Sequence, residues 1–205
     1  MEKKNIRIPQ QKRSIAKKER IVDAAYRVFN RDGFFNSSTD DIAEEAGFSV
    51  GSIYSYYTDK QEILIACLNK FGKALTEDIC KEISSLADDG DIEDTIHRVI
   101  MISIKSHSGQ SLLYHNEVNS LKFRDEDVKE YFETIRQTMM DAIARAMATK
   151  GYAFQYTAEQ SFLLFQMLEG VEDQLAFDER PNINHDMLVQ ECVRLIDSML
   201  IKTES

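Results

Sequence analysis

The scarcity of proline is the feature that most restricts how this chain can fold. Only two of its 205 residues are proline, Pro9 and Pro181, so no proline interrupts a helix over the long interval between them. Apolar residues in this interval recur mostly at spacings of three and four. No stretch alternates cleanly with the period of two that a half-buried strand requires. The sequence therefore predicts an all-α fold.

Glycines, capping residues and Pro181 divide the chain into nine helices. Asp32-Gly33 and Asp89-Gly90 each follow a helical run, so they indicate helix ends rather than hairpin turns. Thr39 is suited to cap the second helix, and a capping box between Thr58 and Gln61 is expected to start the fourth. The helices are expected at about 12–31, 39–46, 50–56, 59–86, 92–107, 110–121, 126–149, 158–178 and 184–202.

Composition is that of a folded, soluble protein, with 43% hydrophobic and 29% charged residues. The charged N-terminus lacks the apolar segment of a secretory signal, and no apolar run approaches the roughly 18 residues that span a bilayer. Three cysteines, Cys67, Cys80 and Cys192, lack any C-x-x-C spacing and are expected to be free thiols. These features predict a cytoplasmic protein without a membrane segment.

Charge is distributed unevenly along the chain. The formal net charge of −10 argues against a general binder of polyanions, yet most side chains that carry charge in residues 1–20 are basic. We expect residues 1–12 to be a basic, flexible arm on an acidic body, suited to a local contact with a polyanion. A solvated tail without a partner is the alternative.

The segment "GFSVGSIYSYYTDK", residues 47–60, resembles two enzyme motifs but lacks the context of either. Its first five residues fit the G-x-S-x-G nucleophile elbow around Ser49, which requires a strand before the serine, whereas the preceding "DDIAEEA" is helical. Tyr56-x-x-x-Lys60 resembles the short-chain dehydrogenases, but no glycine-rich dinucleotide motif accompanies it. We therefore expect no enzyme activity, no catalytic residue and no cofactor.

A helix-turn-helix explains the same segment better. The helices at 39–46 and 50–56 would meet at a tight turn at Gly47. A small core is then expected from Ile42, Ala43, Ala46, Phe48, Ile53 and Tyr57. The residues left facing outward carry no charge and many hydroxyl groups: Ser49, Val50, Gly51, Ser52, Tyr54, Ser55 and Tyr56.

Such an outward face suits insertion into the major groove of DNA, where hydroxyl and small apolar groups read base edges. Gly51 would let backbone approach the DNA, and Tyr54 and Tyr56 could donate hydrogen bonds to phosphates. Lys60 and the start of the fourth helix would add a phosphate site. An ordinary polar helix face is the alternative.

Residues 20–64, "RIVDAAYRVFNRDGFFNSSTDDIAEEAGFSVGSIYSYYTDKQEIL", resemble the N-terminal DNA-binding domain of the TetR family of bacterial regulators. Matching elements include Gly33-Phe34, Ala46-Gly47, Ser49-x-Gly51 and Ile53-Tyr54. The resemblance covers roughly the first 65 residues. By it, the positions that contact DNA are Thr39, Ser49, Gly51, Ser52, Tyr54, Tyr56 and Lys60, to which the outward face adds Val50.

The resemblance also implies a function and a domain plan. It implies a ligand-responsive repressor that binds a palindromic, double-stranded operator as a homodimer. The expected domains are a helix-turn-helix domain at 13–58 and a ligand-binding and dimerisation domain at 59–205. The alternatives are a small-molecule-binding activator or adaptor and, as a further class, a helical enzyme. Tyr56 and Tyr57 depart from the His and Phe that the family often has there.

The last two helices are too apolar to bury only one face, which predicts a four-helix bundle across a two-fold axis; a thicker monomer core is the alternative. The expected interface residues are Phe165, Leu168, Leu175, Leu188, Cys192, Leu195, Ile196 and Met199. An apolar or amphipathic effector is expected at Met101, Tyr114, His115, Phe123, Tyr131, Phe162, Phe165, Gln166 and Glu169, although most of these could simply be core. His107, His115 and Glu117 do not share a helical face, so no metal site is expected.

Overall fold

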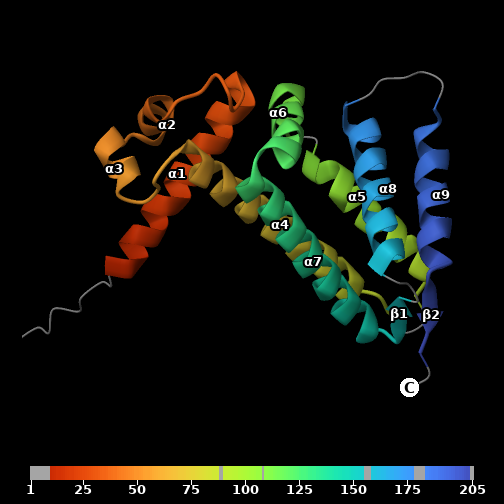
Figure 1. Cartoon of the computed structure of the whole chain (residues 1–205). Helices are drawn as coiled ribbons and strands as arrows, with labels where there is room; N and C mark the ends of the chain where they lie inside the picture. Colours follow the sequence, from red (N-terminus) through yellow and green to blue (C-terminus); the bar gives the residue numbers. More distant parts are fainter. Residues whose placement is uncertain (1–9, 88–89, 108, 155–157, 178–182, 204–205) are drawn as a thin grey trace, which may run out of the picture. The chain divides into compact units, whose positions relative to one another are not determined.

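The computed structural model describes residues 10–87, 90–107, 109–154, 158–177 and 183–203. Nine helices are present among them, as predicted, together with two short strands (Figure 1). The elements are α1 Gln10–Asp32, α2 Thr39–Ala46, α3 Val50–Tyr54, α4 Lys60–Ser84, α5 Ile92–His107, α6 Leu112–Arg124, α7 Glu126–Ala148, β1 Tyr152–Phe154, α8 Ala158–Phe177, α9 His185–Asp197 and β2 Leu200–Lys202. Residues 1–9 of the expected basic arm lie outside the described residues.

The chain forms two compact units. One comprises Met1–Phe71 with Ser111–Tyr131, and the other comprises Gly72–Gln110 with Phe132–Ser205. The first unit therefore contains α1 to α3, the start of α4, all of α6 and the start of α7. Neither unit is a continuous stretch of sequence, which distinguishes this division from a single boundary at residue 58.

An aromatic cluster forms part of the core of the first unit. Phe29 of α1 is fully buried, and its ring lies edge-on to Phe34 with centroids 5.4 Å apart. Tyr114 of α6 stacks on Phe29 at 6.0 Å and is 2% exposed. The apolar residues of α1 are buried from Ile21 onward, whereas Ile15 is 51% exposed. Burial of these rings fixes α6 against α1.

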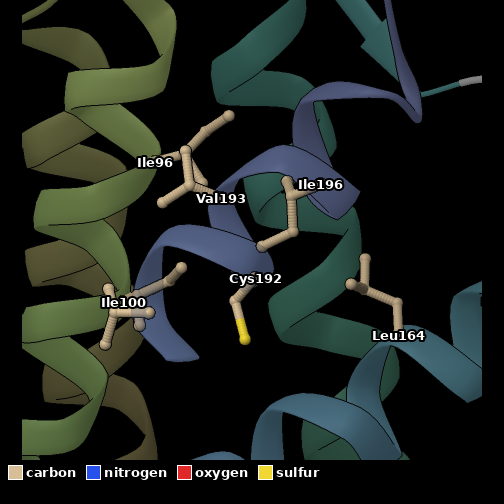
Figure 2. Close-up of a cluster of buried hydrophobic side chains, with 7 residues drawn as sticks. Ile96, Ile100, Leu164, Cys192, Val193 and Ile196 are labelled. Atoms are coloured by element: carbon tan, nitrogen blue, oxygen red, sulfur yellow. The ribbon is translucent and has the colours of Figure 1, made fainter. Parts of the chain in front are cut away.

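The second unit has a core between α5, α8 and α9. Figure 2 shows Ile96 and Ile100 of α5 facing Cys192, Val193 and Ile196 of α9, with Leu164 contributed by α8. A neighbouring cluster joins Ile79 and Ile83 of α4 to Met147 of α7. The periodic apolar residues of these helices thus cover one another within a single chain.

Two strands were not predicted. Helix α9 ends at Asp197 rather than near 202, and β2 pairs in antiparallel register with β1, Tyr152 opposite Lys202. The last turn of α9 is closed by a bond from the Met199 N–H to the Ile196 carbonyl. Each strand has only three residues, too few to show an alternating pattern in the sequence.

Three helix ends differ from the predictions, and at two of them a different side chain provides the cap. Ser38, not Thr39, caps α2, in a reciprocal capping box with Asp41. At the start of α4, Asp59 accepts from the Glu62 N–H at 2.8 Å, and Glu62, not Gln61, accepts from the Thr58 N–H at 2.6 Å. Helix α3 ends at Tyr54, two residues earlier than expected. A carboxylate is the stronger acceptor for free backbone N–H groups.

Candidate nucleic-acid interface

Helices α2 and α3 form the predicted helix-turn-helix against α1 (Figure 1). Gly47 ends α2 in the left-handed conformation, with φ of 68° and ψ of 38°, which a residue with a side chain rarely adopts. The N–H of Gly47 donates to the Glu44 carbonyl and that of Phe48 to the Ala43 carbonyl. Both bonds satisfy carbonyls at the end of α2 and turn the chain sharply into α3.

The small core beneath this turn has the predicted residues with one exception. The buried members are Ile42, Ala43, Ala46, Ile53 and Tyr57. Phe48 is only half-buried, because its ring lies under the guanidinium of Arg20 at 4.7 Å and near the ammonium of Lys17 at 5.9 Å. Phe48 therefore joins α3 to the basic side of α1 instead of filling the core.

The outer face of α3 is uncharged and open. Ser49 and Gly51 are exposed, Tyr54 is 55% exposed, and Val50 and Ser52 are half-buried. A Cβ placed on Gly51 would meet no atom within 4 Å, so the backbone there is directly accessible. Ile53 is the one fully buried residue of α3. The face is thus available to a partner that can approach the backbone closely.

Hydroxyl groups on this face are arranged in pairs. The Tyr54 hydroxyl lies 3.2 Å from Oγ1 of Thr39, which brings two predicted DNA contacts from different helices together. Ser49 is the N-cap of α3, and its Oγ accepts from the Ser52 N–H at 3.3 Å and lies 2.9 Å from Oγ of Ser52. Ser49 therefore has a structural task besides any contact with DNA. Tyr56 is half-buried beyond the end of α3.

Lys60, expected to contact phosphate, forms several contacts within the protein. Its ammonium donates to the carbonyls of Phe34 and Ser37, the latter at 2.6 Å, and lies 4.4 Å from the centre of the Phe34 ring. Burial lowers the pKa of Lys60, and the carboxylate of Glu117 opposes that shift. Since an ammonium has three donors, one remains after these two bonds.

Basic residues of α1 were not singled out from the sequence as part of this interface. Arg20 donates to the Ala46 carbonyl at 2.8 Å, where a cation is favourable at the C-terminus of α2. Lys17 and Lys18 are exposed, and Lys18 lies 5.6 Å from the centre of the Tyr57 ring. The basic composition of residues 1–20 was a signal for these contacts, but their place beside α3 depends on the fold.

Two acidic side chains of α2 have local partners. Glu45 pairs with Arg27 at 2.7 Å and with Arg31 at 3.3 Å, and hydrogen bonding to Arg27 lowers the pKa of Glu45. The Ser38 hydroxyl, by donating to Asp41, lowers the pKa of that carboxyl. The two arginines reduce the repulsion that Glu45 would otherwise exert on a polyanion.

The residues predicted to bind an effector divide between the two compact units. Tyr114, His115, Phe123 and Tyr131 belong to the first unit, whereas Met101, Phe162, Phe165, Gln166 and Glu169 belong to the second. Tyr114 is part of the aromatic cluster, His115 is buried with Nε2 at 2.9 Å from the Asn119 amide, and Phe123 is 88% exposed. Arg136 lies over the rings of Phe162 and Phe165, at 5.5 and 6.0 Å.

The residues predicted for a dimer interface also divide, according to which face of the helix they occupy. Cys192 and Ile196 are 2% and 8% exposed within the single chain and lie in the core of the second unit. Leu168, Leu175 and Met199 pack beside that core, and Phe165 and Leu188 are half-buried. Leu195 is 47% exposed and remains available to a partner.

Two further observations concern the described residues only. No helix among them combines the length and apolar character needed to cross a bilayer. Within the same residues, no three side chains of His, Cys, Asp or Glu are grouped so that they could hold a metal ion.

Comparisons with known proteins agree with this geometry. Residues 21–67 match the family described as "Bacterial regulatory proteins, tetR family". The uncharacterized HTH-type transcriptional regulator YuxN of Bacillus subtilis (strain 168) is 26% identical over 159 residues, which are 72% of this chain but only 51% of that relative. This chain therefore spans about half the length of that curated relative.

Solved structures show the same fold along most of the chain. A TetR transcription regulator from Haloarcula marismortui superposes with a TM-score of 0.68 at 19% identity, covering 91% of this chain and 100% of that one. A protein from Saccharomonospora viridis in complex with choline gives a TM-score of 0.67 at 19% identity, covering 92% of this chain and 99% of that one. The helix-turn-helix within residues 21–67 therefore belongs to the TetR family of bacterial regulatory proteins, and the chain as a whole shares the fold of these solved structures.

Proposed function

We propose that this regulator is a homodimeric, effector-responsive repressor that binds a palindromic operator through α2 and α3. The observation that carries the proposal is the outer face of α3. It exposes accessible backbone at Gly51 and carries no charge, while Glu45 of α2 is paired with arginines. Such a face suits a helix that enters the major groove, because hydroxyl and small apolar groups can read base edges at short range.

The individual contacts follow from where each side chain lies. Val50, Gly51 and Ser52 would meet base edges, and the paired hydroxyls of Thr39 and Tyr54 would donate to a phosphate. Exposed Lys17 and Lys18 supply positive charge beside α3, which phosphate binding requires. Lys60 would contribute only through the donor that its two carbonyl partners leave available.

Exposed apolar side chains on α8 and α9 support the homodimer. Phe162 and Leu163 of α8 are 48% and 63% exposed, and Met187 and Leu195 of α9 are 60% and 47% exposed. Large apolar side chains grouped on two adjacent helices favour burial against a second copy. A two-fold axis would also present two copies of α3 to half-sites about 34–36 Å apart.

Response to a small molecule is proposed for the second unit. The choline bound to the related fold from Saccharomonospora viridis supports binding of a small molecule. Such an effector would shift the population between a conformer that fits the operator and one that does not. The difference between its affinities for the two conformers limits the size of this shift.

A mobility-shift experiment tests the proposal. The protein is titrated onto double-stranded DNA that flanks its own coding sequence, with an excess of unrelated duplex as competitor. Val50→Glu would place a carboxylate on the outer face of α3 and should abolish the specific complex. Asn116→Glu, at an exposed position of α6, makes the same charge change and is the control. Absence of a specific complex with the wild-type protein would contradict the proposed function. A reporter that falls in expression when the gene is deleted would contradict repression alone.

A further inference from the structure

A carboxylate of α6 holds the turn that leads into the helix-turn-helix. The backbone N–H groups of Phe34 and Phe35 both donate to Oε2 of Glu117, the second at 3.1 Å. These residues belong to the segment 33–38 between α1 and α2. Glu117 lies more than 80 positions along the chain from them, in the middle of α6. The contact therefore joins α6 directly to the segment from which α2 begins.

The turn follows directly on the end of α1. Gly33 ends α1 in the left-handed conformation, with φ of 81°. A Cβ on Gly33 would lie 2.9 Å from both carboxylate oxygens of Glu117, so the backbone and the carboxylate are in close contact. Hydrogen bonds from backbone N–H to a carboxylate are roughly twice as strong as neutral ones.

Opposite charges hold the two sides of the same turn. Glu117 accepts from N–H groups, while the Lys60 ammonium donates to the carbonyls of Phe34 and Ser37. Directly after this segment, Ser38 caps α2, and Thr39 presents its hydroxyl to Tyr54. A displacement of the turn would therefore move the first residue of α2 and the paired hydroxyls that are proposed to bind phosphate.

We propose that Glu117 is a positioning residue for DNA binding, which sets the place of α2 and α3 through the turn at Phe34 and Phe35 without contacting DNA. This inference rests on the proposed function of α2 and α3. It assigns to α6 a direct role in operator affinity, and it gives Glu117 a task that its sequence context did not suggest.

The test compares Glu117→Ala and Glu117→Gln with Glu130→Ala and Glu130→Gln. Glu130 is exposed on α7 in the same compact unit. Because both residues are glutamates, the two pairs of variants change the net charge equally. The probe is a duplex selected by the wild-type protein from random sequence. Removing a negative charge generally strengthens binding to DNA. A positioning role for Glu117 predicts the reverse, namely that its variants bind DNA more weakly.

Glu117→Ala should lower affinity for the selected duplex about tenfold or more, as expected when two charge-assisted hydrogen bonds are lost. Glu117→Gln should lose less, because one amide oxygen can accept from both N–H groups as Oε2 does. The dependence of affinity on salt should keep its slope, since no phosphate contact is removed. Amide exchange at Phe34 and Phe35 should accelerate in both Glu117 variants and in neither Glu130 variant.

Two outcomes would overturn the inference. One is equal affinity of the Glu117→Gln and Glu130→Gln proteins for the selected duplex, and the other is unchanged amide exchange at Phe34 and Phe35. Both measurements use the conservative glutamine variant, so they do not depend on whether Glu117→Ala folds. Failure of the wild-type protein to select any duplex would instead refute the proposed function.

Discussion

Substitution of Gly51 by alanine should change the stability of the protein and its DNA affinity in opposite directions. In the free protein the added Cβ meets no atom within 4 Å and the backbone is helical, so it introduces no clash. Alanine in place of glycine in a helix gains up to about 1 kcal/mol, and the five residues of α3 place the gain nearer 0.5 kcal/mol.

On DNA the same methyl group would lie between the α3 backbone and the base edges. Forcing an extra methyl into a packed contact costs about 1–3 kcal/mol, which is about a 5- to 150-fold loss of affinity. Urea unfolding measures the first effect, and fluorescence anisotropy with a labelled operator duplex measures the second. Asn116→Ala, at an exposed position of α6, is the matched control, because it also raises helix propensity but should leave DNA affinity unchanged.

The reasoning fails if Gly51→Ala binds the operator as tightly as the wild type. That result would mean that the backbone of α3 does not approach the DNA closely at this position. A loss of folding stability would instead contradict the open space around Gly51.

Three further predictions concern the hydroxyl face, the small core and the dimer. Tyr54→Phe should leave the unfolding free energy within about 0.5 kcal/mol of the wild type, because the Tyr54 side chain is exposed. The same change should weaken operator binding about 3- to 10-fold without changing the dependence of affinity on salt. Tyr152→Phe, which removes a tyrosine hydroxyl in β1, should bind the operator normally. Burial raises the pKa of Tyr57 to about 12 from 10.0, so the neutral phenol is favoured in the folded state and its stabilisation is lost as pH rises from 10 to 12. Urea unfolding of Tyr57→Phe should show a shallower decline over that window, and an unchanged decline would contradict the assigned burial. Leu163→Glu should sediment as a monomer at micromolar concentration. Leu112→Glu changes a leucine on α6 that is 51% exposed, against 63% for Leu163, and should sediment as the wild type does. A dimeric Leu163→Glu protein would exclude this face of α8 from the interface.

The helix-turn-helix could be predicted because its determinants are local. Gly47 ends α2, Ser49 caps α3, and the apolar residues of both helices have helical spacing, all within one short segment. The sequence also contains the evidence that Ser38, not Thr39, is the N-cap of α2, since Asp41 follows Ser38 by the three residues that a capping box requires.

What the sequence could not predict depends on partners that are distant along the chain. The carbonyls that hold Lys60 are 23 and 26 residues away, and the N–H groups that meet Glu117 are 82 and 83 residues away. The apolar residues of α9 fill more than one face, so only packing against α5 shows that Cys192 and Ile196 point inward and Leu195 outward. Helical periodicity identifies apolar faces but does not identify what covers each one.

The division of the chain into discontinuous units has a consequence for protein engineering. A chimera that takes only residues up to Phe71 as its reader module would leave α6 behind. Phe29 would lose the Tyr114 ring that stacks on it, and the turn at Phe34 and Phe35 would lose its carboxylate. A transplantable reader must therefore carry residues 111–131 as a second segment, joined by a designed linker.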